Sequence, residues 1–139
     1  MTEDATLARF VEAQTKIYDT ALAEIRAGAK RSHWMWYIFP QLRGLGHSPT
    51  AHYYGIASLA EARAYLDHPV LGPRYLECVK ALQGPTNSDP VAVFGSVDAM
   101  KLRSSLTLFE AARASSLIDD ALERWFDGER DASTLRLLA

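Results

Sequence analysis

Apolar residues recur at helical spacing along most of the 139-residue chain. From residue 5 to residue 27 they fall on one side of a helical wheel, which predicts a single amphipathic helix that ends at Gly28. Proline, glycine and N-capping residues divide the rest of the chain into further helical segments and loops. The further helices are expected over about residues 32–40, 48–56, 58–67, 69–82, 97–113, 117–126 and 131–138, and the clearest loop over residues 84–90.

The segment from Ser32 to Pro40, SHWMWYIFP, is apolar almost throughout. Periodicity therefore cannot separate a short buried helix from a buried strand or an irregular stretch. Ser32 can act as an N-cap, and Pro40 limits how far a regular helix can run. We therefore favour a helix here.

The helix expected at 97–113 is apolar on two sides, which is typical of a central helix. One side carries Val97, Met100 and Leu108. The opposite side carries Leu102, Leu106 and Phe109. No segment shows the alternating pattern of a strand, so the fold class is expected to be all-α. We expect residues 1–139 to form a single compact multihelical domain of six to eight helices, several of them short, around this helix.

Composition narrows the classes of function. Hydrophobic residues make up 48% and charged residues 23%, a globular balance, and the formal net charge of −2 argues against a nucleic-acid partner. The acidic N-terminus is unlike a secretory signal, and no apolar run approaches the roughly 20 residues of a membrane helix. The single cysteine, Cys78, cannot form an intramolecular disulfide. We therefore expect a cytoplasmic protein without a membrane partner. Burial within one chain or across a dimer would explain the two apolar sides of the central helix equally well.

Metal and cofactor chemistry find no support in the sequence. The four histidines, His33, His47, His52 and His68, include no pair spaced four residues apart on one helix and have no companion cysteine pair. The nucleophile elbow, the phosphate-binding loop and the dinucleotide fingerprint are all absent. We expect no metal and no cofactor.

Polar residues occur where a core is expected. Gln14 lies in the apolar arc of the first helix, so its amide should bond a backbone group, such as one near Pro40, or a ligand. Lys101 and Ser104 lie one turn apart on an apolar side of the central helix, with Thr107 at the edge. A buried ammonium needs a carboxylate, a carbonyl cluster, an anionic ligand or a path to solvent, and Glu24 and Asp131 are candidate carboxylates.

A cation and a titratable ring precede two large aromatic residues. Lys30 and His33 are followed by Trp34 and Trp36. Stacking and charge pairing can act on different ends of one molecule, so this group suits a ligand with a flat ring and an anionic part. Tryptophans also bury a large area in any core, which is the alternative explanation.

Several motifs are similar to those of a known family. They are Phe10-Val-Glu-Ala-Gln14, Gly28-x-Lys30, Ser32-His-Trp-Met-Trp-Tyr-Ile-Phe-Pro-Gln41, Gly44-Leu-Gly46, His68-Pro-Val-Leu-Gly72, Met100-Lys-Leu-Arg-Ser104-Ser, Thr107-Leu-Phe109 and Asp127-Gly128. On these motifs, which extend over nearly the whole chain, the sequence resembles the bacterial domain-of-unknown-function family numbered 1810.

The resemblance implies an all-α single-domain protein and almost nothing about activity. Some members are labelled calpastatin, but that inhibitor is a long disordered chain with repeats, and the label fits this aromatic-rich sequence poorly. The polar part of the family signature corresponds here to Gln14, Lys30, His33, Gln41, Lys101, Ser104 and Thr107.

Two hypotheses for function follow. The first is a cleft between residues 30–41 and the central helix that binds a small anionic ligand, nucleotide-like or phosphorylated, with lysines supplying charge, tryptophans stacking and glutamines orienting. Its ligand-binding residues would be Gln14, Lys30, Trp34, Trp36, Gln41, Lys101 and Ser104. His33 would be the general acid or base if the protein is an enzyme. The second is a non-enzymatic interaction or scaffold module in which these residues only brace the fold.

Overall fold

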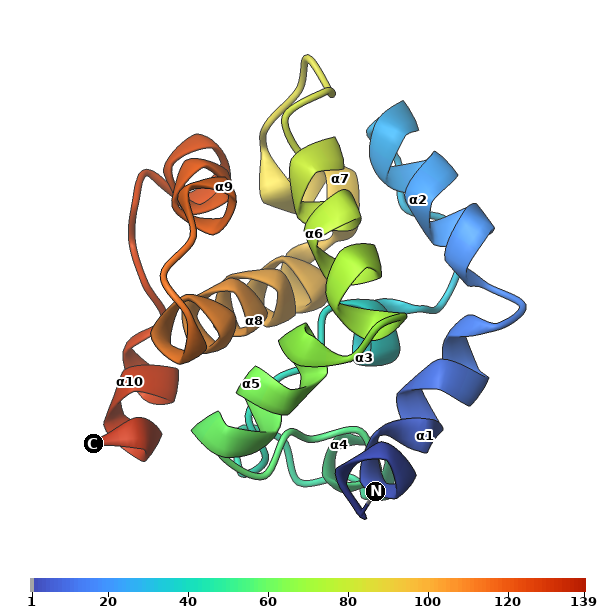
Figure 1. Cartoon of the computed structure of the whole chain (residues 1–139). Coiled ribbons are helices and arrows are strands. Elements are labelled where there is room, and N and C mark those ends of the chain that lie inside the picture. Colours follow the sequence, from blue (N-terminus) through green and yellow to red (C-terminus); the bar gives the residue numbers. More distant parts are fainter. Residues whose placement is uncertain (1) are drawn as a thin grey trace.

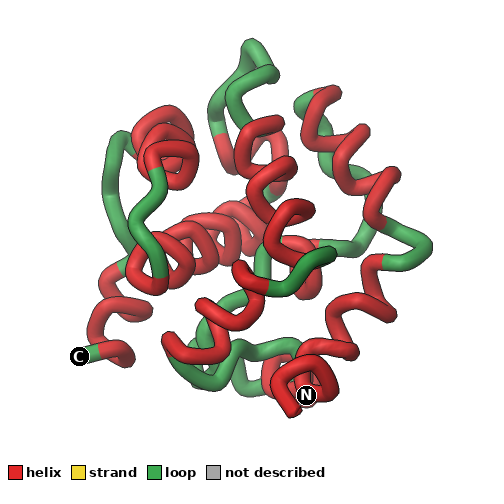
Figure 2. The backbone as a smooth tube through the Cα atoms, in the orientation of Figure 1, coloured by secondary structure: helices red, strands yellow, loops and turns green. Residues whose placement is uncertain are grey.

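The computed structural model describes residues 2–139, and the side chains of residues 7–139. The described chain forms ten helices and no strand, so the all-α expectation is confirmed (Figures 1 and 2). No helix among the described residues has both the length and the apolar character needed to cross a membrane. The helices are α1 (Thr2–Gln14), α2 (Tyr18–Ala27), α3 (Met35–Ile38), α4 (Pro49–Tyr53), α5 (Leu59–Asp67), α6 (Leu71–Ala81), α7 (Pro90–Phe94), α8 (Ser96–Ala112), α9 (Ser116–Phe126) and α10 (Ala132–Leu138).

The single helix predicted over residues 5–27 is in fact two. The chain bends between α1 and α2, as Figure 1 shows, and residues 15–17 form a turn. Thr15 and Ile17 donate their backbone N–H groups three residues back, to Glu12 and Gln14, at 3.3 and 3.2 Å. The Thr15 hydroxyl also donates to the Val11 carbonyl at 2.9 Å. Local side-chain hydrogen bonds of this kind compete with continuation of the helix. They interrupt the helix after Gln14, although the pattern of apolar residues continues through the break.

A short helix, α7, follows the predicted loop and raises the number of helices beyond the expected eight. The side chain of Asp89 accepts hydrogen bonds from Val91 N and Ala92 N, and Pro90 stands in the first turn. An Asp-Pro pair at an N-cap and first helical position is a start signal. The sequence therefore contains a start signal for α7, but this signal lies within residues 84–90, whose composition is typical of a loop.

The helix α8 is central, as expected, because it packs against α3, α5, α7, α9 and α10 (Figure 1). Its residues Leu102, Leu106, Leu108 and Phe109 are buried. The prediction that the start of this helix is also buried is wrong, since Val97 and Met100 are 61% and 60% exposed. The hydrogen bonds that attach the start of α10 to α8 lie farther along, at Ser104 and Thr107 through Asp131, and do not bring α10 over Val97 and Met100.

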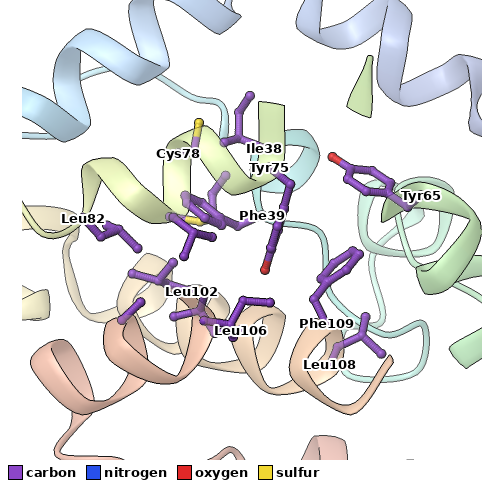
Figure 3. Close-up of a cluster of buried hydrophobic side chains, with 14 of the residues drawn as sticks. Ile38, Phe39, Tyr65, Tyr75, Cys78, Leu82, Leu102, Leu106, Leu108 and Phe109 are labelled. Carbon is purple, nitrogen blue, oxygen red and sulfur yellow. The ribbon is translucent and has the colours of Figure 1, made fainter. Parts of the chain in front are cut away.

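An aromatic cluster joins α3, α5, α6 and α8 (Figure 3). Tyr75 packs against Phe109 with ring centroids 4.3 Å apart and against Phe39 at 5.6 Å. Its buried hydroxyl is hydrogen-bonded to Ser105 Oγ at 3.0 Å. Cys78 is also buried and unpaired here, as expected of a free cysteine in a core. This cluster fixes residues 35–39 against the central helix.

Candidate functional site

The carboxylate of Glu24 positions the segment that precedes α3. It accepts hydrogen bonds from Arg31 N at 2.8 Å, Ser32 N at 3.0 Å, Ser32 Oγ at 2.6 Å and Trp34 Nε1 at 2.9 Å. Ser32 is therefore not the N-cap that we predicted, and regular helix begins only at Met35. Partial burial by itself raises the pKa of Glu24, but these hydrogen bonds outweigh it and lower the pKa from 4.5 to about 2.

This depressed pKa predicts a loss of stability in acid. A group with a lowered pKa in the folded state stabilises the fold above its unfolded pKa, here 4.5, and the contribution disappears as pH falls toward about 2. Glu24→Gln should cost about 1 to 3 kcal/mol at pH 7, because solvent screens part of the interaction, and less at pH 3. Urea unfolding at pH 7, 5 and 3 measures this, with exposed Asp120→Asn as control. An identical pH profile for wild type and Glu24→Gln would contradict this role.

Two lysines meet at one carboxylate, Asp98, in the first turn of α8. The Lys30 ammonium lies 2.8 Å from Asp98 Oδ2, donates to the Ser32 carbonyl, and stands 5.0 Å from the centroid of the Trp34 ring. The Lys101 ammonium lies 3.8 Å from Asp98 Oδ1. It also stands 3.5 Å from the centroid of the Trp36 ring. Each ammonium therefore lies between the shared carboxylate and an indole.

Lys101 is the less satisfied of the two cations. Its side chain is only 16% exposed, yet among the described residues its ammonium makes no hydrogen bond and its nearest carboxylate oxygen is 3.8 Å away. Desolvation lowers the pKa of Lys101, Asp98 raises it and Lys30 lowers it further, with a net decrease. Lys30 lies at hydrogen-bond distance from Asp98 Oδ2, whereas Lys101 lies beyond that distance from Asp98 Oδ1 and keeps donors without an acceptor.

Asp98 is the residue that sequence reasoning assigned wrongly. By sequence, either Ser96 or Asp98 is an N-cap candidate for the central helix, but α8 begins at Ser96 with Gly95 as N-cap and has no side-chain cap. We expected Glu24 or Asp131 as the carboxylate partner of Lys101, and Asp98 takes that place. The signal was present, since an acid three residues before a lysine lies on the neighbouring helical face.

A groove of about 630 Å³ lies beside this cluster, between α8, the start of α10 and the chain after α3. Its lining includes two of the predicted ligand-binding residues, Gln41 and Ser104, together with Arg103 and Met100. Lys101 is not part of the lining. It projects from the same helix one turn before Ser104, on the side of Trp36.

The hydroxyls of Ser104 and Thr107 already have internal partners. Ser104 Oγ donates to Asp131 Oδ2 at 3.0 Å, and Asp131 N donates to Thr107 Oγ1 at 2.9 Å. The same carboxylate oxygen accepts from the N–H and the hydroxyl of Thr134, at 3.1 and 2.5 Å. These bonds attach α10 to α8, so Ser104 has a structural task even though it lines the groove.

The structure does not bring Gln14 or His33 to the groove. Gln14 is buried, donates to the Tyr37 carbonyl at 2.7 Å and to Tyr65 Oη at 3.0 Å, and accepts from Arg74 at 3.4 Å. This is the backbone partner near Pro40 that the sequence predicted, and it occupies the amide. His33 is exposed, and its carbonyl accepts from Tyr37 Oη at 2.8 Å. No group of three potential metal ligands occurs in the described part of the chain.

Comparison with known proteins decides the family. A family model described as "Protein of unknown function (DUF1810)" matches residues 4–138. The chain belongs to the DUF1810 family. The DUF1810 fold is also similar to a crystal structure of the conserved hypothetical protein Rv1873 from Mycobacterium tuberculosis. That protein is 46% identical, the match covers 99% of this chain and 98% of Rv1873, and the TM-score is 0.94. No curated protein matches this DUF1810 chain.

Proposed function

We propose that this domain binds a small anionic molecule at the edge of the groove, with Lys101 as the principal cation. The observation on which this depends is Lys101, whose side chain is 16% exposed and whose ammonium has no hydrogen-bond acceptor among the described residues. An ammonium has three N–H donors and is strongly stabilised by charged acceptors. A phosphate or carboxylate of a ligand would supply them.

The surroundings of Lys101 suit such a ligand. Two ammonium groups share the single carboxylate of Asp98, which leaves positive charge uncompensated at that contact. The adjoining groove, of about 630 Å³, is within the usual size of a small-molecule site. Gln41 lines it, and its side-chain amide has no partner among the described residues, so it can orient a bound group. Nucleotide-like or phosphorylated molecules combine the required charge and size.

The proposal is one of binding and assigns no reaction. His33 is exposed, and its ring does not line the groove. We therefore assign His33 no role in a reaction, although it directly precedes Trp34 and lies three residues before Trp36. We place this function in the cytoplasm, because the lone cysteine, Cys78, is a buried free thiol, as in proteins of reducing compartments.

Lys101→Met should weaken ligand binding without unfolding the domain. Methionine keeps the apolar stem that covers Trp36 and removes the ammonium. A thermal-shift screen of nucleotides and phosphorylated metabolites on the wild type should identify a stabilising ligand, because binding raises apparent stability by mass action. The affinity for it should fall about tenfold or more in the variant, since a charge-assisted bond is lost.

Lys80→Met, on the exposed side of α6, is the matched control and should show the same ligand-induced thermal shift as the wild type. A screen in which no compound stabilises the wild type, or a ligand that binds Lys101→Met as tightly, would refute the proposal.

A scaffold function is the second candidate, and one observation favours it. Val97 and Met100 are 61% and 60% exposed, one turn apart, and Met100 also lines the groove. Exposed apolar residues that adjoin one another are typical of protein interaction sites. If the domain is a scaffold, no compound of the screen stabilises it, and Lys101→Met changes the thermal shift of none of them.

A further inference from the structure

A second available cation, Arg103, reaches the same groove. Its side chain lines the groove and is 30% exposed. Among the described residues, its carboxylate partner is Glu129, with Nη1 and Oε1 3.5 Å apart, and the Glu129 side chain is 77% exposed. Exposed pairs of this kind contribute little. The Arg103 guanidinium can therefore exchange Glu129 for an anionic group of a ligand.

The other charged residues of the groove are already engaged. Arg130 binds both Glu110 oxygens, Asp119 at 3.2 Å and the Gly128 carbonyl at 2.6 Å. Asp131 is buried, and one of its oxygens accepts three hydrogen bonds. Lys101 and Arg103 are thus the two cations beside this groove that can turn to a ligand.

These two cations approach from different sides of α8. Successive residues of an α-helix are about 100° apart, so side chains two positions apart leave the helix on nearly opposite sides. Between them lies the face formed by Met100 and Ser104, which is part of the groove lining. We therefore expect a compact anion to contact one of Lys101 and Arg103 and not both. An elongated molecule lying across this face can contact both.

We infer that the groove selects a ligand with two separated anionic groups, such as a sugar bisphosphate. One group lies at Lys101 and the Gln41 amide, and the other replaces Glu129 at Arg103. The linker between them has both polar and apolar groups, because it lies against Ser104 and Ser133 and against Met100. This inference rests on the proposed function and names the ligand class for the same site.

Calorimetric titration with fructose 1,6-bisphosphate and fructose 6-phosphate tests the inference. The wild type should bind the bisphosphate about tenfold more tightly, because the second group gains a charge-assisted bond. Arg103→Gln should remove the preference for the bisphosphate, so that the two sugars bind with about equal affinity. Arg136→Gln, on the exposed side of α10, is the control and should change neither affinity.

Glu129→Gln should raise the bisphosphate affinity, whereas Arg103→Gln should lower it. The Glu129 substitution removes the competitor of Arg103, so the bisphosphate affinity should rise about two- to threefold, which a purely structural role of Arg103 does not predict. Equal affinities of the wild type for the two sugars, or a preference that survives in Arg103→Gln, would overturn the two-anion inference and leave the proposed function standing. If neither sugar binds while another compound of the screen does, this inference fails and the proposed function stands. If no compound of the screen binds, or if Lys101→Met binds its ligand normally, the proposed function fails and this inference fails with it.

Discussion

Trp34→Ala is expected to lower the free energy of unfolding by about 4 kcal/mol. The Trp34 ring is fully buried and packs against Phe39 and Phe94, with centroids 6.4 and 6.5 Å away. Its removal leaves a cavity, takes one donor from the Glu24 carboxylate, and exposes the Lys30 ammonium to a void. Loss of a large buried aromatic side chain is among the most destabilising single substitutions.

Urea unfolding followed by circular dichroism measures the effect. The matched control is Trp36→Ala, two residues away, where the ring is half-buried and its partner is Lys101. Only part of the ring leaves water there, so we expect a loss of about 1 to 2 kcal/mol. Equal losses at the two tryptophans would show that Trp34 does not occupy the core position described above.

Gly72→Ala is expected to destabilise the domain by about 3 kcal/mol or more. A Cβ atom at Gly72 would stand 2.0 Å from the Leu66 carbonyl oxygen and 2.9 Å from its carbonyl carbon. Both are backbone atoms of α5, so no side-chain rotation relieves the clash. The turn between the two helices is also bonded locally, because His68 Nδ1 accepts from Val70 N and Leu71 N at 3.1 and 3.3 Å. Relief therefore requires α5 and α6 to move apart.

Chemical denaturation of Gly72→Ala and Gly84→Ala makes the comparison. A Cβ at Gly84 would meet only the Ala81 carbonyl oxygen, at 3.4 Å, so this substitution should be close to neutral. If Gly72→Ala unfolds at the same urea concentration as the wild type, the close approach of α5 and α6 is not as described.

The local features of the fold could be predicted from the sequence because each depends on neighbouring residues. Ser58 Oγ accepts from Glu61 N at 3.2 Å and Asp131 Oδ2 from Thr134 N at 3.1 Å, and both are residue types that favour the N-cap position before an apolar helical segment. The central helix, predicted at 97–113, runs from Ser96 to Ala112. The break after Gln14 could not be predicted, because the apolar arc continues through it.

The candidate site was predictable as a set of residue types and not as an arrangement. Lys30 and Lys101 were both expected to supply charge, yet their common partner Asp98 follows from the tertiary structure. Gln41 and Ser104 lie together in the groove, whereas Gln14 is buried against Tyr37 and Tyr65. Arg103 was not expected as a site residue, because a charged residue on a helix is most often only solvated.

Sequence alone therefore determined the all-α class, several of the helix starts and the position of the central helix, because spacing and capping act over a few residues. The tertiary structure decided which charges meet and which apolar residues stay exposed. Lys30 meets Asp98 only because Glu24 and the aromatic core hold the chain after α2 against α8. Periodicity shows that Val97 and Met100 share a face, but whether another helix covers that face depends on contacts between segments distant in sequence.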